Sequence, residues 1–462
     1  MRQSRVLALF LMGYAILLLA TIVATPLRLD EILQLIGSSN HSILGLIRWI
    51  AETPGSAPLN YFVQLPFVLA GSHSRIAARV PSLLFALGSS YLFIRLAKRI
   101  PVRWPYLALA LFMLLPVHYR FASQGTPVEQ ALFFLLAATI CYLRLVQNPS
   151  PRACVDYAAF LLLCLYTDPA SFLPAIGYAL FLIRSVNTAH GRRVIWFALP
   201  ATTLPVLLFL PYYFWAHPQM NSDWLFEPST YSSGLPIYLQ PLHSLGAGGW
   251  NGYIIAGLLG LGTLAALWGL LRSPVRGLAR ELALFYLFGG VLSAVAIPTA
   301  IDLWSRTPFS PSHVLWAVPG MIILSFAAPE SFLRKGLLDP VIVAFALLGV
   351  VLSCTIDIGY LRQSDQDLQA ETALIRPQLT GDSCVVFVSE RLSKSLFLLF
   401  DPALDTHECL NFFHKRVVLA SHPYVRPDEQ ANAESYFRGL NFREESRMSA
   451  GGGKIIVLEQ NQ

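Results

Sequence analysis

Two adjacent carboxylates, Asp30 and Glu31, follow the first long apolar run of the chain, in the sequence ATPLRLDEILQLIG. Desolvated carboxylates are costly at a membrane boundary, so the pair is expected either to stay solvated or to serve a function. A carboxylate near a sugar phosphate can act as general base, taking a proton from an acceptor hydroxyl or amine as it attacks the anomeric carbon. The alternative is a pair of interfacial acids that begin a helix and are favoured by its dipole. Position alone leaves both interpretations open.

Several arginines at or near the ends of the apolar runs could bind a phosphate group. Arg75 and Arg79 are four residues apart, which places them on one face of a helix. A guanidinium can donate two hydrogen bonds to a phosphodiester. The alternative is that such side chains extend to lipid headgroups, which we favour for Arg75, whereas we favour binding for Arg79. Arg28 and Arg306 are further candidates.

Membrane helices must position these side chains. The chain is 55% hydrophobic and 13% charged, whereas soluble domains carry about 25% charged residues. This composition excludes a disordered chain and argues against an ordinary soluble enzyme. The apolar runs have the length of about 20 residues that crosses a bilayer, and they must be helical because lipid-facing backbone groups need partners within the segment. We expect about eleven transmembrane helices, at roughly 6–26, 76–97, 104–118, 128–146, 153–167, 169–186, 194–215, 251–271, 282–300, 313–329 and 339–358. The first is interpreted as an uncleaved anchor, since its apolar run is longer than that of a signal peptide.

Basic residues set the expected orientation. One set of connecting loops holds sixteen Lys and Arg residues, and the opposite set holds six. Because Lys and Arg accumulate in cytoplasmic loops, we expect a multi-pass plasma (inner) membrane protein with a cytoplasmic N-terminus and an extracytoplasmic C-terminal domain. This distribution also accounts for the net charge of +6 without a nucleic-acid partner. The outer loops are the longer ones, so chemistry is expected on the external face.

The outer segments predict two kinds of structure. Residues 27–75 contain amphipathic stretches that are expected to lie along the interface, with Trp49 and Tyr61 as anchors. From about residue 360 the composition becomes that of a soluble domain, with a helix over 365–376 and strands in SCVVFVS, KRVVLAS and GGGKIIVLEQ. We therefore divide the chain into a transmembrane domain, 1–358, and a small α/β domain, 359–462.

Two local patterns in the C-terminal domain suggest a disulfide and a phosphate-binding loop. Cys384 and Cys409 could form a disulfide outside the cell, but their separation in space is unknown from the sequence. The GGGK run resembles part of a phosphate-binding loop, but Ile455 follows where Ser or Thr is required, and a strand follows instead of a helix. We interpret it as a turn.

The order of the segments resembles that of membrane-embedded GT-C-type glycosyltransferases, the protein-mannosyltransferase and lipid A aminoarabinose-transferase group. Those enzymes begin with one span, a DE pair in the first outer loop, an interfacial helix with a Pro-Pro-Leu-Tyr-Tyr-like element, and a second span that opens with Arg-Leu-Pro-Ser. The counterparts in this chain are Asp30 and Glu31, then Pro58, Leu59 and Tyr61, then Arg79, Pro81 and Ser82. The match is in register over about the first 150 residues and only topological beyond.

The resemblance implies an enzyme that transfers a sugar from a polyprenyl-phosphate donor to a protein, lipid or glycan acceptor at the outer face. It implies Asp30 as the base, assisted by Glu31. The expected substrate-binding residues are Arg28, Tyr61, Arg79, Glu129 and Arg306. No cofactor and no metal are expected. The plausibly external histidines (His41, His118, His217, His243 and His313) do not have a spacing that fixes two ligands on one element, and a lone His is more often a surface residue.

Three departures from the family pattern support an alternative. Gly125 stands where a Glu is expected, although Glu129 lies one helical turn later and could replace it, or could simply cap a helix. Asp168 stands where relatives have His, and Ser312-His313 where an Arg-Tyr pair is common. The alternative is a non-catalytic membrane subunit on a degenerate scaffold, with a membrane-protein partner. A transporter is disfavoured, because transporters place charges near the bilayer midplane.

Overall fold

In the computed structural model of the chain, the described residues are 2–27, 29–38, 43–52, 58–71, 74–100, 102, 104–181, 189–216, 249–272, 287–297, 299–300, 315–327, 335–361, 368–379, 383–388, 397–398, 401–409, 415–421, 427–450 and 453–461. The chain divides into two compact units. The first comprises Met1–Ala20, His41–Pro66 and Arg79–Tyr360, and the second comprises Thr21–Asn40, Phe67–Ala78 and Leu361–Gln462. The second unit thus includes two early segments that the sequence-based boundary at 358 assigned to the membrane domain.

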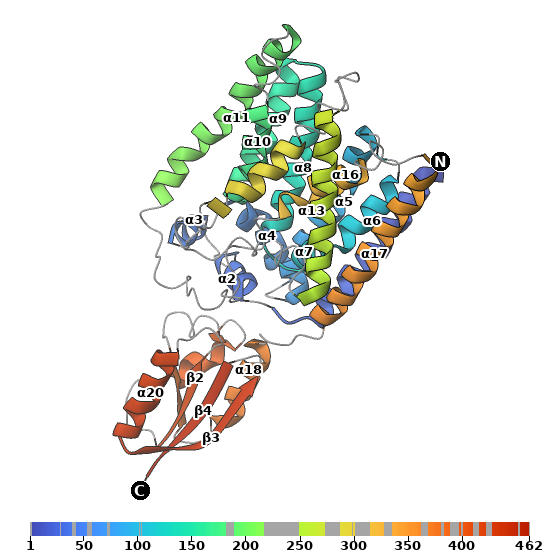
Figure 1. The fold of residues 1–462 in the computed structure, drawn as a ribbon. Coiled ribbons are helices and arrows are strands. Elements are labelled where there is room, and N and C mark those ends of the chain that lie inside the picture. The colour runs from blue at the N-terminus through green and yellow to red at the C-terminus, as the bar shows by residue number, and fades with distance from the viewer. Residues whose placement is uncertain are drawn as a thin grey trace. The chain divides into compact units, whose positions relative to one another are not determined.

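The first unit is built from long apolar helices (Figure 1). In chain order they are α1 (Arg2–Ala24), α3 (Ile43–Glu52), α4 (Pro58–Gly71), α5 (Arg75–Arg99), α6 (Pro105–Leu114), α7 (Pro116–Ala122), α8 (Val128–Gln147), α9 (Pro151–Thr167), α10 (Leu173–Phe181), α11 (Ala189–Ala216), α13 (Gly249–Arg272), a helix at Leu287–Ile297, α16 (Val318–Ala327) and α17 (Lys335–Leu361). Every expected transmembrane segment thus contains a helix. Among the described residues, five helices are long and apolar enough to cross a membrane, or six with the bent pair α6 and α7. The chain is a polytopic helical membrane protein, as predicted.

Helices α5 and α8 run parallel to each other. Their contacts, from the beginning of both helices to the end, are Ser82 Oγ to the carbonyl oxygen of Thr126 just before α8 (3.2 Å), the rings of Phe85 and Phe133 (centroids 5.5 Å apart), and Arg99 Nη2 to Gln147 Oε1 (2.6 Å). The residue numbers rise together along both helices. The same end of the bundle therefore holds the C-terminal ends of both, and the opposite end holds Ser82 and Thr126.

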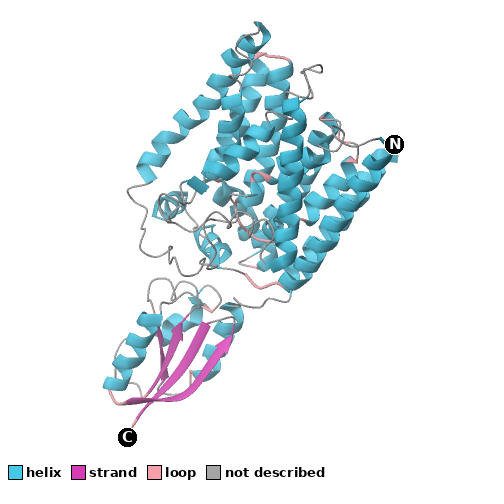
Figure 2. Ribbon diagram, in the orientation of Figure 1, coloured by secondary structure: helices cyan, strands magenta, loops and turns pink. Residues whose placement is uncertain are grey.

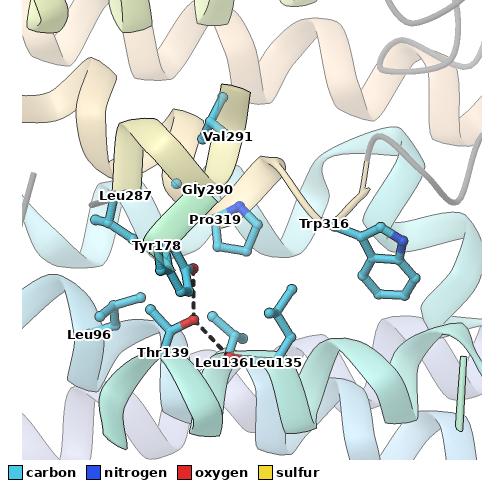
Figure 3. Close-up of a pocket in the computed structure, with 11 residues that line it drawn as sticks. Leu96, Leu135, Leu136, Thr139, Tyr178, Leu287, Gly290, Val291, Trp316 and Pro319 are labelled. Carbon is cyan, nitrogen blue, oxygen red and sulfur yellow. Dashed lines mark hydrogen bonds between the residues drawn. The ribbon is translucent and has the colours of Figure 1, made fainter. Parts of the chain in front are cut away.

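Helices α8, α9 and α11 pack on one another (Figure 1). The core that they share contains buried tyrosine rings. Tyr142 and Tyr178 stack with their ring centroids 5.1 Å apart, and the Tyr142 hydroxyl donates to the Tyr178 carbonyl oxygen. Beside them lies a cavity of about 10 Å³, the space of one water molecule. Figure 3 shows Thr139 hydrogen-bonded to Tyr178 in its wall. At this point between the described helices the side chains leave room for about one water molecule.

Glycines allow the closest helix contacts. A Cβ atom on Gly177 of α10 would collide with the backbone carbonyl of Gly289, whereas one on Gly257 of α13 would meet nothing within 4 Å. Small residues at helix interfaces let membrane helices approach closely. Gly177 is thus required by packing, and Gly257 is not.

The expected span at 104–118 is broken. Helices α6 and α7 are bent by 64° at Leu115, because Pro116 has no backbone N–H and disfavours a helical residue before it. Apart from Arg120 and Pro127, which are half-buried, residues 115–130 are buried. What the sequence suggested was an outer loop is therefore packed inside the first unit.

The second unit contains helix α2 (Leu29–Ser38) and a small α/β fold (Figure 2). Its described strands β1 (Ser383–Phe387), β2 (Arg416–Ser421), β3 (Phe442–Ala450) and β4 (Gly453–Gln460) form a sheet in the order β1-β2-β4-β3, with β1 and β2 parallel and the other pairs antiparallel. Helices α18 (Leu368–Ile375) and α20 (Pro427–Gly439) pack against it. The predicted strands and the predicted helix are confirmed, and β3 was not predicted.

Alternate residues of the strands divide the core of the second unit between the two faces of the sheet. One face buries Val417, Leu419 and Phe437 of α20, together with Cys384. Cys384 forms a disulfide with Cys409, and their Cα atoms are 5.0 Å apart. On the other face, strand residues pack with residues of α18, of α2 and Leu27 before it, of segment 67–78 and of the region 397–404. The buried members of this cluster are Leu27, Ile32, Leu35, Val68, Ala78, Ile375, Val385, Phe387, Phe397, Leu404, Val418, Ala420 and Ile455. The apolar side of α2 is therefore part of this core.

Candidate functional site

Arg79 lies in the first turns of α5 and is 1% exposed, the largest of the fully buried side chains described. A buried guanidinium is expensive unless partners or a ligand compensate its charge. One turn later Ser82 Oγ donates to the carbonyl oxygen of Thr126, 3.2 Å away. The Arg-x-Pro-Ser element is thereby joined to the turn 123–126, which contains Gly125, one of the departures from the family pattern.

A second buried group lies where α7 meets α8. His118 and Glu129 are both 0% exposed, and His118 Nε2 is 3.5 Å from Glu129 Oε2. The other ring nitrogen, Nδ1, is 3.3 Å from the hydroxyl of Tyr14 in α1. The imidazole also packs on Phe112, with the ring centroids 4.1 Å apart. Three elements of the first unit thus place the ionisable side chains of Tyr14, His118 and Glu129 next to one another away from solvent.

This arrangement corrects two sequence-based interpretations. His118 is not a surface histidine, because the bend at Leu115 turns α7 into the interior. Glu129 is in the first turn of α8 but does not cap the helix. The N-cap residue is Pro127, and no side chain accepts a capping hydrogen bond from the backbone there. The sequence offered only weak signals for these partners: Tyr14 is a polar group in the middle of an apolar span, a position that by default suggests function.

Tyr61 of α4 is 3% exposed and lies in a cluster with Leu46 and Ile50 of α3. Trp49 and Tyr212 pack against that cluster. The expected interfacial anchor thus has its ring inside the first unit. A role for its hydroxyl in substrate binding stays a prediction.

The predicted acidic pair lies in the second unit, at the beginning of α2. Asp30 is in the first turn of the helix, and its side chain lies outside what the structure describes. Glu31 is 0% exposed. A solvated Glu31 at the interface is therefore excluded, although it does begin a helix as the alternative interpretation required. The catalytic roles of both residues stay predictions.

The remaining candidates divide into those with a visible structural role and those outside the described ranges. Asp168 caps the 3-10 helix Pro169–Phe172, and its Oδ1 accepts a hydrogen bond of 2.9 Å from Ala170 N. Arg28, Arg306, Ser312 and His313 lie outside the described residues. Within the described ranges, no group of three or more His, Cys, Asp or Glu side chains could hold a metal ion.

The fold has counterparts among solved structures. ArnT from Cupriavidus metallidurans in the apo state aligns with a TM-score of 0.56 and 12% identity, covering 98% of this chain and 98% of that chain. The structure of ArnT from the same organism bound to undecaprenyl phosphate aligns with a TM-score of 0.53 and 13% identity, covering 97% of each chain. No protein-family model and no curated protein matches the sequence. The chain therefore has the fold of these ArnT structures over nearly its whole length.

Proposed function

We propose that this chain is an integral-membrane glycosyltransferase that takes a sugar from a polyprenyl-phosphate donor and transfers it to an acceptor at the outer face of the membrane. The observation that carries the proposal is the buried Arg79 at the beginning of α5, tied through Ser82 to the turn before α8. A phosphodiester accepts two hydrogen bonds from such a guanidinium. The fold supports the proposal, because an ArnT with this fold binds undecaprenyl phosphate.

In the proposed reaction, Asp30 takes the proton of the acceptor hydroxyl or amine while that group forms a bond to the anomeric carbon. The bond from the anomeric carbon to the phosphate oxygen breaks, and the polyprenyl phosphate leaves with the electron pair. Arg79 stabilises the negative charge that develops on the phosphate. Glu31 assists in the same loop, and Arg28, Tyr61, Glu129 and Arg306 contact the substrates.

The proposed enzyme has a defined location and orientation in the membrane. The protein lies in the inner (plasma) membrane, with the N-terminus in the cytoplasm and the C-terminal domain outside. The acceptor is a protein, lipid or glycan. No metal or cofactor takes part in the proposed step, because a carboxylate base and a guanidinium supply the required proton transfer and charge stabilisation.

The experiment separates binding of the carrier lipid from sugar transfer. Purified protein is titrated with undecaprenyl phosphate, and thermal stabilisation is measured for the parent, for Arg79→Gln and for Arg75→Gln. Losing the charge-assisted hydrogen bonds should weaken binding at least tenfold in Arg79→Gln, whereas Arg75, which is half-buried, should matter little. Incorporation of labelled sugar by membranes is then compared for the parent and Asp30→Asn. Equal affinity of the parent and Arg79→Gln would refute the phosphate site, and equal incorporation would remove Asp30 from the mechanism.

A non-catalytic subunit is the second candidate. Asp168, at the place of a family histidine, is engaged as a helix cap, and Gly125 has no side chain to replace the family's Glu. A subunit of this kind has a membrane-protein partner, so it copurifies with a second protein in a fixed ratio. Undecaprenyl phosphate binding without sugar transfer by any membrane preparation would favour this candidate.

A further inference from the structure

Four cations gather at the end of the bundle opposite Arg79. Arg95, Lys98 and Arg99 occupy the last turns of α5, and Arg144 is in the last turn of α8. Because α5 and α8 run parallel, their C-terminal ends meet, and Arg144 and Arg95 are cationic neighbours that repel the charge of Arg99. We call Arg95, Lys98, Arg99 and Arg144 the basic cluster.

Neutral partners hold three of these side chains in place. Lys98 Nζ donates to the Tyr106 hydroxyl (3.1 Å) and lies 4.9 Å from the centre of that ring. Arg99 Nη2 donates to Gln147 Oε1 over 2.6 Å. The Arg95 guanidinium lies 5.8 Å above the Tyr91 ring. These contacts position the cations, but they bring no negative charge.

The positive charge of the cluster has no protein counterion within the described ranges. None of the ion pairs there involves the basic cluster. Among the described acids, Asp156 of α9 acts electrostatically on Cys141, a neighbour of the cluster, but it forms no ion pair with the four cations. The four positive charges repel one another. A bound anion would therefore lower the electrostatic energy of the basic cluster. An arginine has five N–H donors, and Arg99 uses one of them on Gln147.

We propose that the basic cluster binds the phosphodiester headgroup of an anionic phospholipid. Arg95, Lys98 and Arg144 are exposed, and the exposed aromatic side chains Tyr91 and Trp104 beside them are of the kind that lies at headgroup level. Basic pockets between membrane helices bind such headgroups. Cations on the cytoplasmic side also set the orientation of a membrane protein, but that effect depends on their number. It does not require that side chains from two helices lie close together, as they do in the basic cluster. The proposal is independent of the proposed enzymatic function.

The test measures lipid binding to the delipidated full-length protein in detergent by native mass spectrometry. The probes are dioleoyl phosphatidylglycerol, dioleoyl phosphatidylcholine and soluble glycerol 3-phosphate. The variant is Arg99→Gln with Arg144→Gln. The control, Arg192→Gln with Arg193→Gln, removes the same charge from exposed positions of α11, at the same end of the bundle, since His190 Nε2 is 2.8 Å from the Val146 carbonyl oxygen.

The parent should bind phosphatidylglycerol in preference to phosphatidylcholine. Each cation removed from the basic cluster should weaken phosphatidylglycerol binding about fivefold, hence about 25-fold for the double variant, and less than about twofold for the control. If the double variant unfolds, the single variant Arg95→Gln at an exposed position gives the same test. Its affinity for phosphatidylglycerol should fall about fivefold. Equal losses in variant and control, equal binding of both lipids, or full displacement by glycerol 3-phosphate would overturn the proposal.

Discussion

Removing one partner of the buried pair His118 and Glu129 should destabilise the membrane unit far more than removing both. The two side chains are 3.5 Å apart and wholly shielded from solvent. Glu129→Leu leaves the imidazole without its carboxylate, and His118→Phe leaves the carboxylate without its imidazole. In each single variant a polar or charged group stays buried without compensation.

The expected cost of either single substitution is about 3–5 kcal/mol in the free energy of unfolding, the usual range for breaking a buried pair. The double variant replaces the pair by apolar groups next to Phe112, whose ring already packs on the imidazole. It should lie within about 1 kcal/mol of the parent, because such replacements are often neutral. Tyr14→Phe, which removes one hydrogen bond of 3.3 Å to His118, should cost about 1 kcal/mol.

The assay is equilibrium unfolding of the purified protein in mixed detergent micelles, followed for all four members of the double-mutant cycle. Tyr14→Phe is the matched control, because it changes the same cluster without leaving a charge. Single effects that simply add in the double variant, with a coupling below about 0.5 kcal/mol, would refute the reasoning. The pair would then be two independent side chains that happen to be close.

Three further outcomes follow from the packing and the charges. Gly177→Ala should lower stability in detergent by about 1–3 kcal/mol through overpacking, while Gly257→Ala, which meets nothing within 4 Å, should not; equal effects would contradict the contact. Reducing the disulfide of the C-terminal sheet, whose cysteines are 25 residues apart, should destabilise that sheet by about 3 kcal/mol, seen as faster proteolysis there; an unchanged digestion rate would argue against it. Arg447 donates a hydrogen bond to Glu444 and lowers the pKa of that carboxyl from its ordinary value of 4.5. Because the pKa of Glu444 is lower in the folded state, this stabilisation is present above about pH 4.5 and is lost as the pH falls through the folded-state pKa. The melting temperature of Glu444→Gln should therefore vary less over this pH range than that of the parent. Identical pH profiles of the two melting temperatures would exclude the effect.

The helices were predictable because membrane spans depend on local composition. Eleven apolar runs predicted helices, and each run contains one. The break at Leu115 had a visible cause in Pro116, but the direction of the bend depends on what α7 packs against. Strand β3 was missed because FREESRMSA alternates weakly and is rich in charges, as befits an edge strand, whereas the inner strands KRVVLAS and GGGKIIVLEQ carry clear apolar runs.

The candidate site was predictable only in part, since burial arises from tertiary contacts. The order of motifs identified Arg79 and Ser82, and the structure joins Ser82 to Thr126. No local pattern distinguishes a solvated Glu31 from a buried one, or links His118 to Tyr14, which is 104 residues away in the sequence. The cysteine pairing was likewise open until the Cα separation of 5.0 Å was known.

The parallel packing of α5 and α8 has a mechanical consequence. A helix of 25 residues is about 37 Å long, so the two ends of α5 lie far apart. Both ends of α5 are fastened to the α8 segment by polar contacts, through Ser82 at one end and Arg99 at the other. Sliding one helix past the other would therefore break a hydrogen bond at each end, that of Ser82 to Thr126 and that of Arg99 to Gln147.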